Sequence, residues 1–114
     1  MKNFNDKVAA ITGAGSGMGR ALARSLAAQG CHVAISDITE DALNETRDLI
    51  ANRNVKVTTH VLDVSDRQQV EQYAEDVARE HGRVNLIFNN AGVSVTDTVE
   101  HFDYSDFEWL ININ

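Results

Sequence analysis

The chain has 114 residues and a formal net charge of −7 at pH 7, with 43% hydrophobic and 24% charged residues. This length fits a single domain over residues 1–114, with the composition of an ordinary soluble globular protein. The acidic balance argues against a nucleic-acid partner, because phosphate binding depends on clustered Lys and Arg. No segment approaches the roughly 20 apolar residues of a membrane span. The one cysteine, Cys31, cannot form an internal disulfide, which suits a reducing cytosol. We therefore expect a cytoplasmic protein in which Cys31 is buried and inert.

Short apolar runs predict buried strands at residues 8–11, 32–36, 55–62 and 84–88. Helical patterns separate these runs, and a further helix is expected to begin at Ser105. Such alternation builds a parallel sheet with helices on both faces, and right-handed crossovers leave few possible topologies. The sequence therefore predicts an α/β fold with a doubly wound parallel sheet.

Three helices are predicted between the strands from apolar residues that recur three and four positions apart. The first ends at Gly30, a residue suited to a C-terminal cap. The second begins at Thr39. The third begins at Ser65, which forms a capping box with Gln68, and ends at Gly82. The residues expected to face the core are Met18, Ala21, Leu22, Ser25 and Leu26 in the first helix, Ala42, Leu43, Thr46, Leu49 and Ile50 in the second, and Val70, Tyr73, Ala74, Val77 and Ala78 in the third.

A glycine-rich segment joins the first strand to the first helix. It fits the spacing T-G-x-x-x-G-x-G, and not G-x-G-x-x-G. A turn without side chains lets the backbone approach a pyrophosphate, and the helix that follows presents free N–H groups and its positive end. The alternative is a turn without a ligand, but the position between a strand and a helix favours binding. The cofactor-binding residues predicted here are Gly13, Gly15, Ser16, Gly17, Met18 and Gly19.

Asp37 ends the second predicted strand. A carboxylate at this point can accept hydrogen bonds from both ribose hydroxyls of adenosine and would repel a 2′-phosphate. Neither neighbour, Ser36 or Ile38, is a basic residue that could receive that phosphate. NAD is therefore favoured over NADP. The alternative is an Asp that only begins a helix, since Thr39 and Glu40 follow.

Taken together, the glycine loop, Asp37, Asp63-Val64 and Asn89-Asn90-Ala91-Gly92 resemble the short-chain dehydrogenase/reductase family over essentially the whole chain. The resemblance implies a Rossmann-type fold with strand order 3-2-1-4-5-6-7 and hydride transfer between NAD and an alcohol or carbonyl substrate. In the family the Asn-Asn-Ala-Gly loop stabilises the sheet beside the cofactor, and the residue matched by Asp63 reads the adenine amino group. Alone, Asp63 is also explained as a loop residue before a helix. The further cofactor-binding residues so implied are Ile38, Asp63, Val64, Asn90, Ala91 and Gly92.

The resemblance aligns Asn114, and not Asn112, with the family's catalytic Asn, which holds a water in a proton relay. The alternative for Asn114 is a frayed polar terminus. The family's chemistry also needs a Ser and a Tyr-x-x-x-Lys. Neither Tyr73 nor Tyr104 is followed by Lys at that spacing, and no lysine follows Lys56. No metal site is expected, because the four histidines lack ligand spacing.

We therefore expect the 114 residues to be the N-terminal part of an enzyme about twice as long, ending after the fourth strand and the start of the next helix. This would leave residues 86–88 as an apolar sheet edge that invites pairing. The expected function is that of an NAD-dependent oxidoreductase whose 114-residue part alone is inactive. One alternative is a non-catalytic dinucleotide-binding module. A methyltransferase shares the glycine loop and the acidic strand end but not the Asn-Asn-Ala-Gly loop. The family also implies a homodimer or homotetramer.

Overall fold

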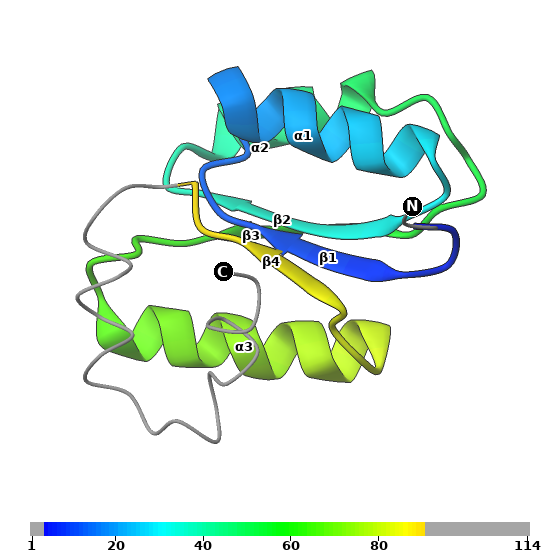
Figure 1. Cartoon of the computed structure of the whole chain (residues 1–114). Helices are drawn as coiled ribbons and strands as arrows, with labels where there is room; N and C mark the ends of the chain where they lie inside the picture. The colour runs from blue at the N-terminus through cyan, green and yellow to red at the C-terminus, as the bar shows by residue number, and fades with distance from the viewer. Residues whose placement is uncertain (1–3, 91–114) are drawn as a thin grey trace.

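The computed structural model describes residues 4–90, which form a four-stranded parallel sheet with helices on both faces (Figure 1). The predicted residues Ala91, Gly92 and Asn114, and the helix expected from Ser105, lie outside the described residues. The strands are β1 (Val8–Ile11), β2 (His32–Asp37), β3 (Val57–Val61) and β4 (Leu86–Phe88). The helices are α1 (Gly17–Ala28), α2 (Glu40–Leu49) and α3 (Arg67–His81). The strand order is β3-β2-β1-β4 and each pair is parallel, so the predicted doubly wound arrangement is confirmed.

Strand β1 lies inside the sheet, paired with β2 on one side and β4 on the other. Its four residues are at most 2% exposed. Alternate side chains enter opposite cores: Ala9 and Ile11 pack under α1 and α2, whereas Ala10 packs under α3. A strand covered on both faces has no polar side, which explains its unbroken apolar sequence.

The two faces of the sheet are covered unequally: α1 and α2 lie on one face and α3 lies alone on the other (Figure 1). On the first face Cys31 is fully buried, as expected. Burial raises the pKa of its thiol to about 11, so Cys31 stays protonated at neutral pH. On the second face Tyr73 donates its hydroxyl proton to the Ala34 carbonyl over 2.8 Å, which pairs the phenol inside the core. No helix within residues 4–90 is long and apolar enough to cross a membrane.

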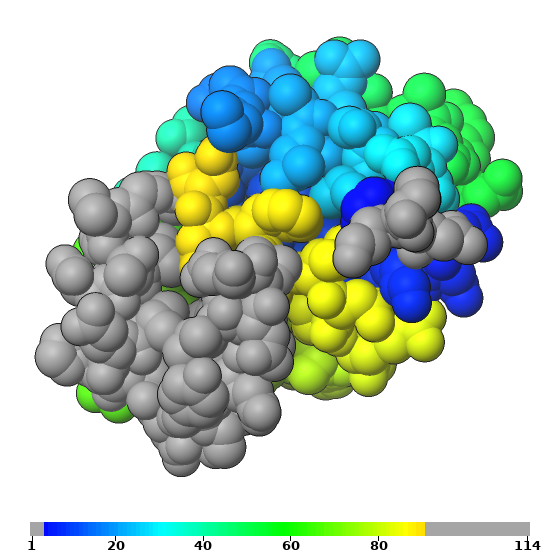
Figure 2. All heavy atoms as spheres, in the orientation of Figure 1, coloured from blue at the N-terminus to red at the C-terminus, as the bar shows by residue number. Residues whose placement is uncertain are grey.

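Among the strands within residues 4–90, β4 pairs only with β1. Its residues, yellow in Figure 2, reach the surface beside α1. Ile87 is buried in the core under α3, while Leu86 and Phe88 are half-buried against the core under α1 and α2. Strand β4 is shorter than predicted, because residues 84 and 85 lie outside it. Strand β3 is also shorter, because residues 55, 56 and 62 lie outside it.

The predicted core face of α1 is wrong in part. Met18, Ala21 and Ser25 are exposed, with Met18 at 76%. The buried residues are Gly19, Ala23, Leu26 and Ala27. Most of them are small, because α1 lies close to the sheet. A prediction that looks for large apolar residues at helical spacing therefore assigns the wrong face of this helix to the core.

The other two helices need smaller corrections. Leu49 in α2 and Ala78 in α3 are exposed, although both were predicted to face the core. Ile50, predicted as the last core residue of the second helix, is the C-cap residue just after α2. Helix α3 is capped by Asp66, whose carboxylate accepts hydrogen bonds from the backbone N–H groups of residues 68 and 69. The capping box predicted at Ser65 is therefore wrong by one residue. Gly82 ends α3 as predicted, with a left-handed φ of +79°.

A pair of histidines lies between β3 and the end of α3. The Thr58 hydroxyl is 2.8 Å from His81 Nε2 and 3.0 Å from His60 Nε2. The His60 ring also contacts the Tyr73 ring edge-on, with centroids 5.0 Å apart. Burial lowers the pKa of His60, and burial with the nearby Lys56 charge lowers the pKa of His81 to about 4. Both rings are therefore neutral at pH 7.

We predict that the fold loses stability as the pH falls from about 6.5 to about 4. Over this range His81 binds a proton in the unfolded chain but not in the folded one, so protonation favours unfolding. The His81→Gln variant, whose amide can still bond Thr58, should reduce this loss by about 1 kcal/mol, allowing for solvent screening. Urea midpoints at pH 7.5 and pH 4.5 measure the difference. An equal loss in the variant and the wild type would contradict the assignment.

Candidate functional site

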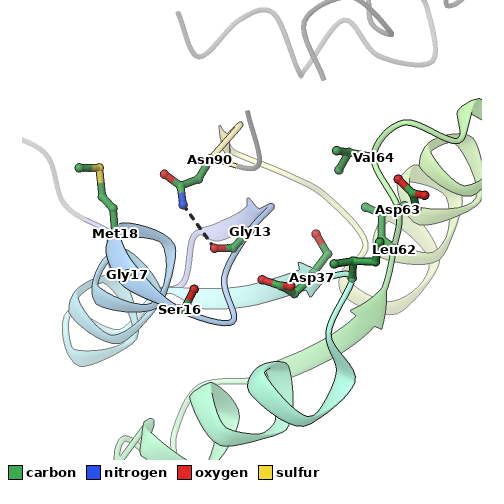
Figure 3. Close-up of a pocket in the computed structure, with 11 residues that line it drawn as sticks. Gly13, Ser16, Gly17, Met18, Asp37, Leu62, Asp63, Val64 and Asn90 are labelled. Carbon is green, nitrogen blue, oxygen red and sulfur yellow. Dashed lines mark hydrogen bonds between the residues drawn. The ribbon is translucent and has the colours of Figure 1, made fainter. Parts of the chain in front are cut away.

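A cleft of about 440 Å³ opens at the carboxyl ends of the strands (Figure 3). The chain builds outward from β1 to β2 and β3, then crosses back to place β4 on the other side of β1. Adjacent loops diverge at such a reversal, and doubly wound sheets bind their ligands there. The cleft is lined by Gly13, Ser16, Gly17, Met18, Ser36, Asp37, Ile38, Leu62, Asp63, Val64 and Asn90.

Most of the predicted cofactor-binding residues within the described chain line this cleft. Gly15 and Gly19 instead pack against residues that do. Ser36 and Leu62 also line the cleft and were not predicted. Both are buried residues at or just after strand ends, so in the sequence they resemble core residues. Only the sheet topology indicates that these strand ends meet.

The glycine loop owes its shape to three close or unusual positions. Gly13 and Gly17 adopt left-handed φ values of +65° and +56°, which L side chains rarely adopt. At Gly19, a Cβ atom would clash with the Gly13 carbonyl oxygen and lie 2.7 Å from Asn90 Nδ2. Gly19 therefore lets α1 pack close to the Gly13 turn and to Asn90.

The N-terminus of α1 faces the cleft with its positive end uncompensated. Ser16 is the N-cap, yet its side chain makes no capping hydrogen bond, and the first turn holds no acidic residue. By contrast, α2 carries Glu40 and Asp41 in its first turn, and α3 is capped by Asp66. The first N–H groups of a helix have no partner within it. This end of α1 is therefore suited to bind an anion.

Asp37 fastens the glycine loop to the end of β2. Its Oδ2 accepts the Gly15 N–H over 2.8 Å, and its Oδ1 accepts the Thr39 N–H over 3.0 Å. A Cβ on Gly15 would lie 2.7 Å from Asp37 Oδ2, so a side chain at this position would break the contact. Each carboxylate oxygen accepts more than one hydrogen bond. Asp37 can therefore anchor the loop, help to begin α2 and still accept ligand hydroxyls.

On the side of the cleft away from the start of α1, Asp63 shapes the loop between β3 and α3 (Figure 3). Its Oδ1 accepts the Ser65 N–H over 2.9 Å and the Ser65 hydroxyl over 2.6 Å. These hydrogen bonds hold the pKa of the Asp63 carboxyl below its usual range, so the group is ionised at neutral pH. In Figure 3 the start of α1 lies at one side of the cleft and Asp63 at the other, with Asp37 between them and Asn90 above.

Asn90 connects the end of β4 to the glycine loop. Its N–H donates to Thr12 Oγ1 over 3.0 Å, and its side-chain Nδ2 donates to the Gly13 carbonyl over 3.3 Å (Figure 3). Thr12 in turn donates its N–H to the Phe88 carbonyl over 3.0 Å. These bonds hold the two strand ends together. Within residues 4–90, no group of three or more His, Cys, Asp or Glu is placed to bind a metal ion.

Known proteins similar to this chain come from one family. A family model described as short chain dehydrogenase matches residues 7–114. Levodione reductase of Leifsonia aquatica is 37% identical over 114 residues, which cover 97% of this chain and 43% of that protein.

Two solved structures share the fold. A short chain dehydrogenase/reductase from Burkholderia phymatum in complex with NAD is 43% identical, with a TM-score of 0.76 over 82% of this chain and 33% of that one. A metagenomic short-chain oxidoreductase in complex with NADP is 30% identical, with a TM-score of 0.74 over 81% of this chain and 42% of that one. The fold is therefore of the Rossmann type. The chain spans about two fifths of the length of levodione reductase and of several other curated relatives, and 19% of a longer one.

We predict that Gly19→Ala lowers the free energy of unfolding by about 2–3 kcal/mol, because the new methyl group overpacks the contact between α1 and the Gly13 turn. Gly17→Ala is the matched control. It meets no atom within 4 Å and costs only about 1 kcal/mol for its left-handed φ. Urea denaturation measures both values. A smaller loss for Gly19→Ala than for Gly17→Ala would show that α1 does not need this close approach.

Proposed function

Because the chain belongs to the short-chain dehydrogenase/reductase family, we propose that residues 1–114 form the NAD-binding part of an oxidoreductase. The proposal rests above all on one observation. The uncapped, acid-free N-terminus of α1 and the Asp37 carboxylate line the same cleft. One suits the pyrophosphate of a dinucleotide and the other its adenosine ribose.

Each predicted residue then has a role matched to its place. The Ser16, Gly17 and Met18 backbone binds the pyrophosphate at the positive end of α1. Ile38 offers an apolar side chain that is 63% exposed beside Asp37, as expected for a residue that covers the adenine. Asp63 binds the adenine amino group, with Val64 beside it.

Asn90 has its amide bound to Gly13, and it holds the glycine loop against the end of β4 beside the cofactor. We propose that Ala91 and Gly92, which continue this segment, also border the cofactor, as the resemblance implies. Their backbone lies outside the described residues.

We further propose that the cofactor is NAD and not NADP. A 2′-phosphate on the ribose would lie against the Asp37 carboxylate, and neither Ser36 nor Ile38 supplies a positive charge to compensate it. Like charges about 4 Å apart repel by about 1 to 4 kcal/mol at effective dielectric constants between those of water and of a protein surface. Since related structures hold NAD or NADP, this preference depends on Asp37.

The cofactor preference is testable by calorimetry with NAD and NADP. The wild-type chain should bind NAD at least about tenfold more tightly. Asp37→Asn, which removes the charge but keeps the shape, should reduce this ratio mainly by improving NADP binding. Asp41→Asn is the control, because it removes an equal charge from the first turn of α2 without lining the cleft. Tighter binding of NADP by the wild type would refute the role of Asp37.

When bound, the nicotinamide ring supplies a hydride acceptor or donor. The 114 residues contain no Tyr-x-x-x-Lys, since Val77 follows Tyr73 and Glu108 follows Tyr104 at that spacing. Tyr73 is also fully committed to the core, because burial raises the pKa of its phenol and its hydroxyl bonds Ala34. We propose that these residues bind the dinucleotide without turning over substrate, and that Asn114 serves the proton relay of the whole protein.

For the whole protein we propose hydride transfer to or from a small alcohol or carbonyl substrate in a homodimer or homotetramer, as the family resemblance implies. We also propose a cytoplasmic location, on the basis of the single cysteine, Cys31. The non-catalytic alternative, a dinucleotide-binding module, is favoured for the 114 residues alone by the missing tyrosine and lysine.

We predict that the purified 114-residue chain binds NAD but produces no NADH from a panel of secondary alcohols. The measurement is absorbance at the NADH band, with an active dehydrogenase as positive control. Activity that co-purifies with the chain and disappears in Asp37→Arg would contradict the proposed division between binding and chemistry.

A further inference from the structure

Arg20 follows the glycine loop in sequence and reaches back beneath it. Its Nη2 donates to the Gly15 carbonyl and, over 3.2 Å, to the Ala42 carbonyl. Its Nε donates to Thr46 Oγ1 over 2.9 Å, and its Nη1 pairs with Glu45 Oε1 at 2.8 Å. One planar guanidinium therefore joins the glycine loop to α2.

Thr46 joins α2 to the residue before Gly15 in the glycine loop. Its side chain is fully buried, accepts the Arg20 hydrogen bond and donates its own hydroxyl proton to the Ala14 carbonyl over 2.7 Å. The consecutive carbonyls of Ala14 and Gly15 are thus both held from the side of α2. Ala14 has no exposed surface, so its carbonyl would lose a hydrogen bond without Thr46.

Fixing these two carbonyls also fixes the directions of two N–H groups. In a planar trans peptide the C=O of one residue and the N–H of the next point in opposite directions. The Gly15 N–H, opposite the Ala14 carbonyl, indeed points to Asp37 Oδ2, 2.8 Å away. By the same rule, the hydrogen bond of Arg20 to the Gly15 carbonyl directs the N–H of Ser16, a residue that lines the cleft, away from α2.

We propose that Arg20, together with Thr46, is a positioning residue that aims the Ser16 N–H and the start of α1 at the pyrophosphate of the bound dinucleotide. The inference rests on the proposed NAD binding. Arg20 acts by orienting the backbone and not by its positive charge. Its guanidinium already pairs with Glu45, and its side chain is only 23% exposed. Neither residue touches the cofactor cleft itself.

The test compares ligands that contain a pyrophosphate with one that does not. NAD and ADP binding is measured by calorimetry, and adenosine binding by NMR chemical-shift titration. Arg20→Met removes the fork of donors while keeping a long side chain, and Thr46→Val removes only the hydroxyl. Arg24→Met is the matched control, since it removes the same charge from an exposed position of α1. Val77→Ala destabilises the core under α3, on the opposite face of the sheet.

Arg20→Met should weaken NAD and ADP binding about tenfold, the effect of losing the hydrogen bond from the Ser16 N–H to the charged pyrophosphate. Adenosine binding should change less than about twofold. Thr46→Val should act in the same direction. Arg24→Met and Val77→Ala should leave the ratio of ADP to adenosine affinity unchanged, which separates positioning from a general loss of stability.

Four outcomes would overturn the inference. Unchanged ADP binding in Arg20→Met, or an equal loss for adenosine, would assign Arg20 a merely structural role while leaving the proposed function intact. If Arg24→Met weakened ADP binding as much as Arg20→Met does, the cause would be the loss of positive charge and not the orientation of the backbone. A wild-type chain that binds neither NAD nor ADP would refute the proposed function itself, and the inference with it.

Discussion

The close approach of α1 to the first turn of the glycine loop is the constraint on which the rest of the structure depends. At Gly19 the helix passes so near the Gly13 carbonyl and the Asn90 amide that no Cβ fits. This contact sets the distance of α1 from the sheet, and it explains why the buried face of α1 consists mostly of glycine and alanine. It also brings the positive end of the helix to the strand ends, where the cleft opens. Helix packing and the position of the cleft therefore both depend on glycine, which has no side chain, at position 19.

The cleft also shows how an acidic protein can hold an anion. The chain carries a net charge of −7, and carboxylates of Asp37 and Asp63 line the cleft. Each of them is bound to nearby donors: Asp37 to two backbone N–H groups, and Asp63 to the backbone and hydroxyl of Ser65. Positive potential comes instead from backbone dipoles at the start of α1, where no acidic side chain competes. Negative and positive groups are thus separated within one cleft, as a ligand with a sugar diol and a phosphate requires.

The sequence was enough to predict the order of the strands and helices, the glycine loop and the acidic end of β2, because each leaves a local pattern. It was not enough to predict the phase of α1, since periodicity follows large apolar residues whereas this helix buries small ones. The cap of α3 was misplaced by one residue because Ser65 and Asp66 are both good N-cap residues, and the choice depends on Asp63 binding Ser65. The contacts of Arg20 and Thr46 join positions on two helices, and no pattern in either helix indicates that they meet.

The central place of β1 has a consequence for how this chain acquires its fold. Strand β1 precedes the other three strands in the chain and needs partners on both sides. One of them, β4, pairs with β1 through residues 77 positions apart in sequence. A nascent chain can pair β1 with β2 and β3 early, but one edge of β1 stays open until residues near 90 emerge. Native contacts of such long sequence separation slow folding and expose apolar edges in intermediates. During translation, the open edge of β1 is therefore a place where an incomplete chain exposes apolar surface and an unpaired strand.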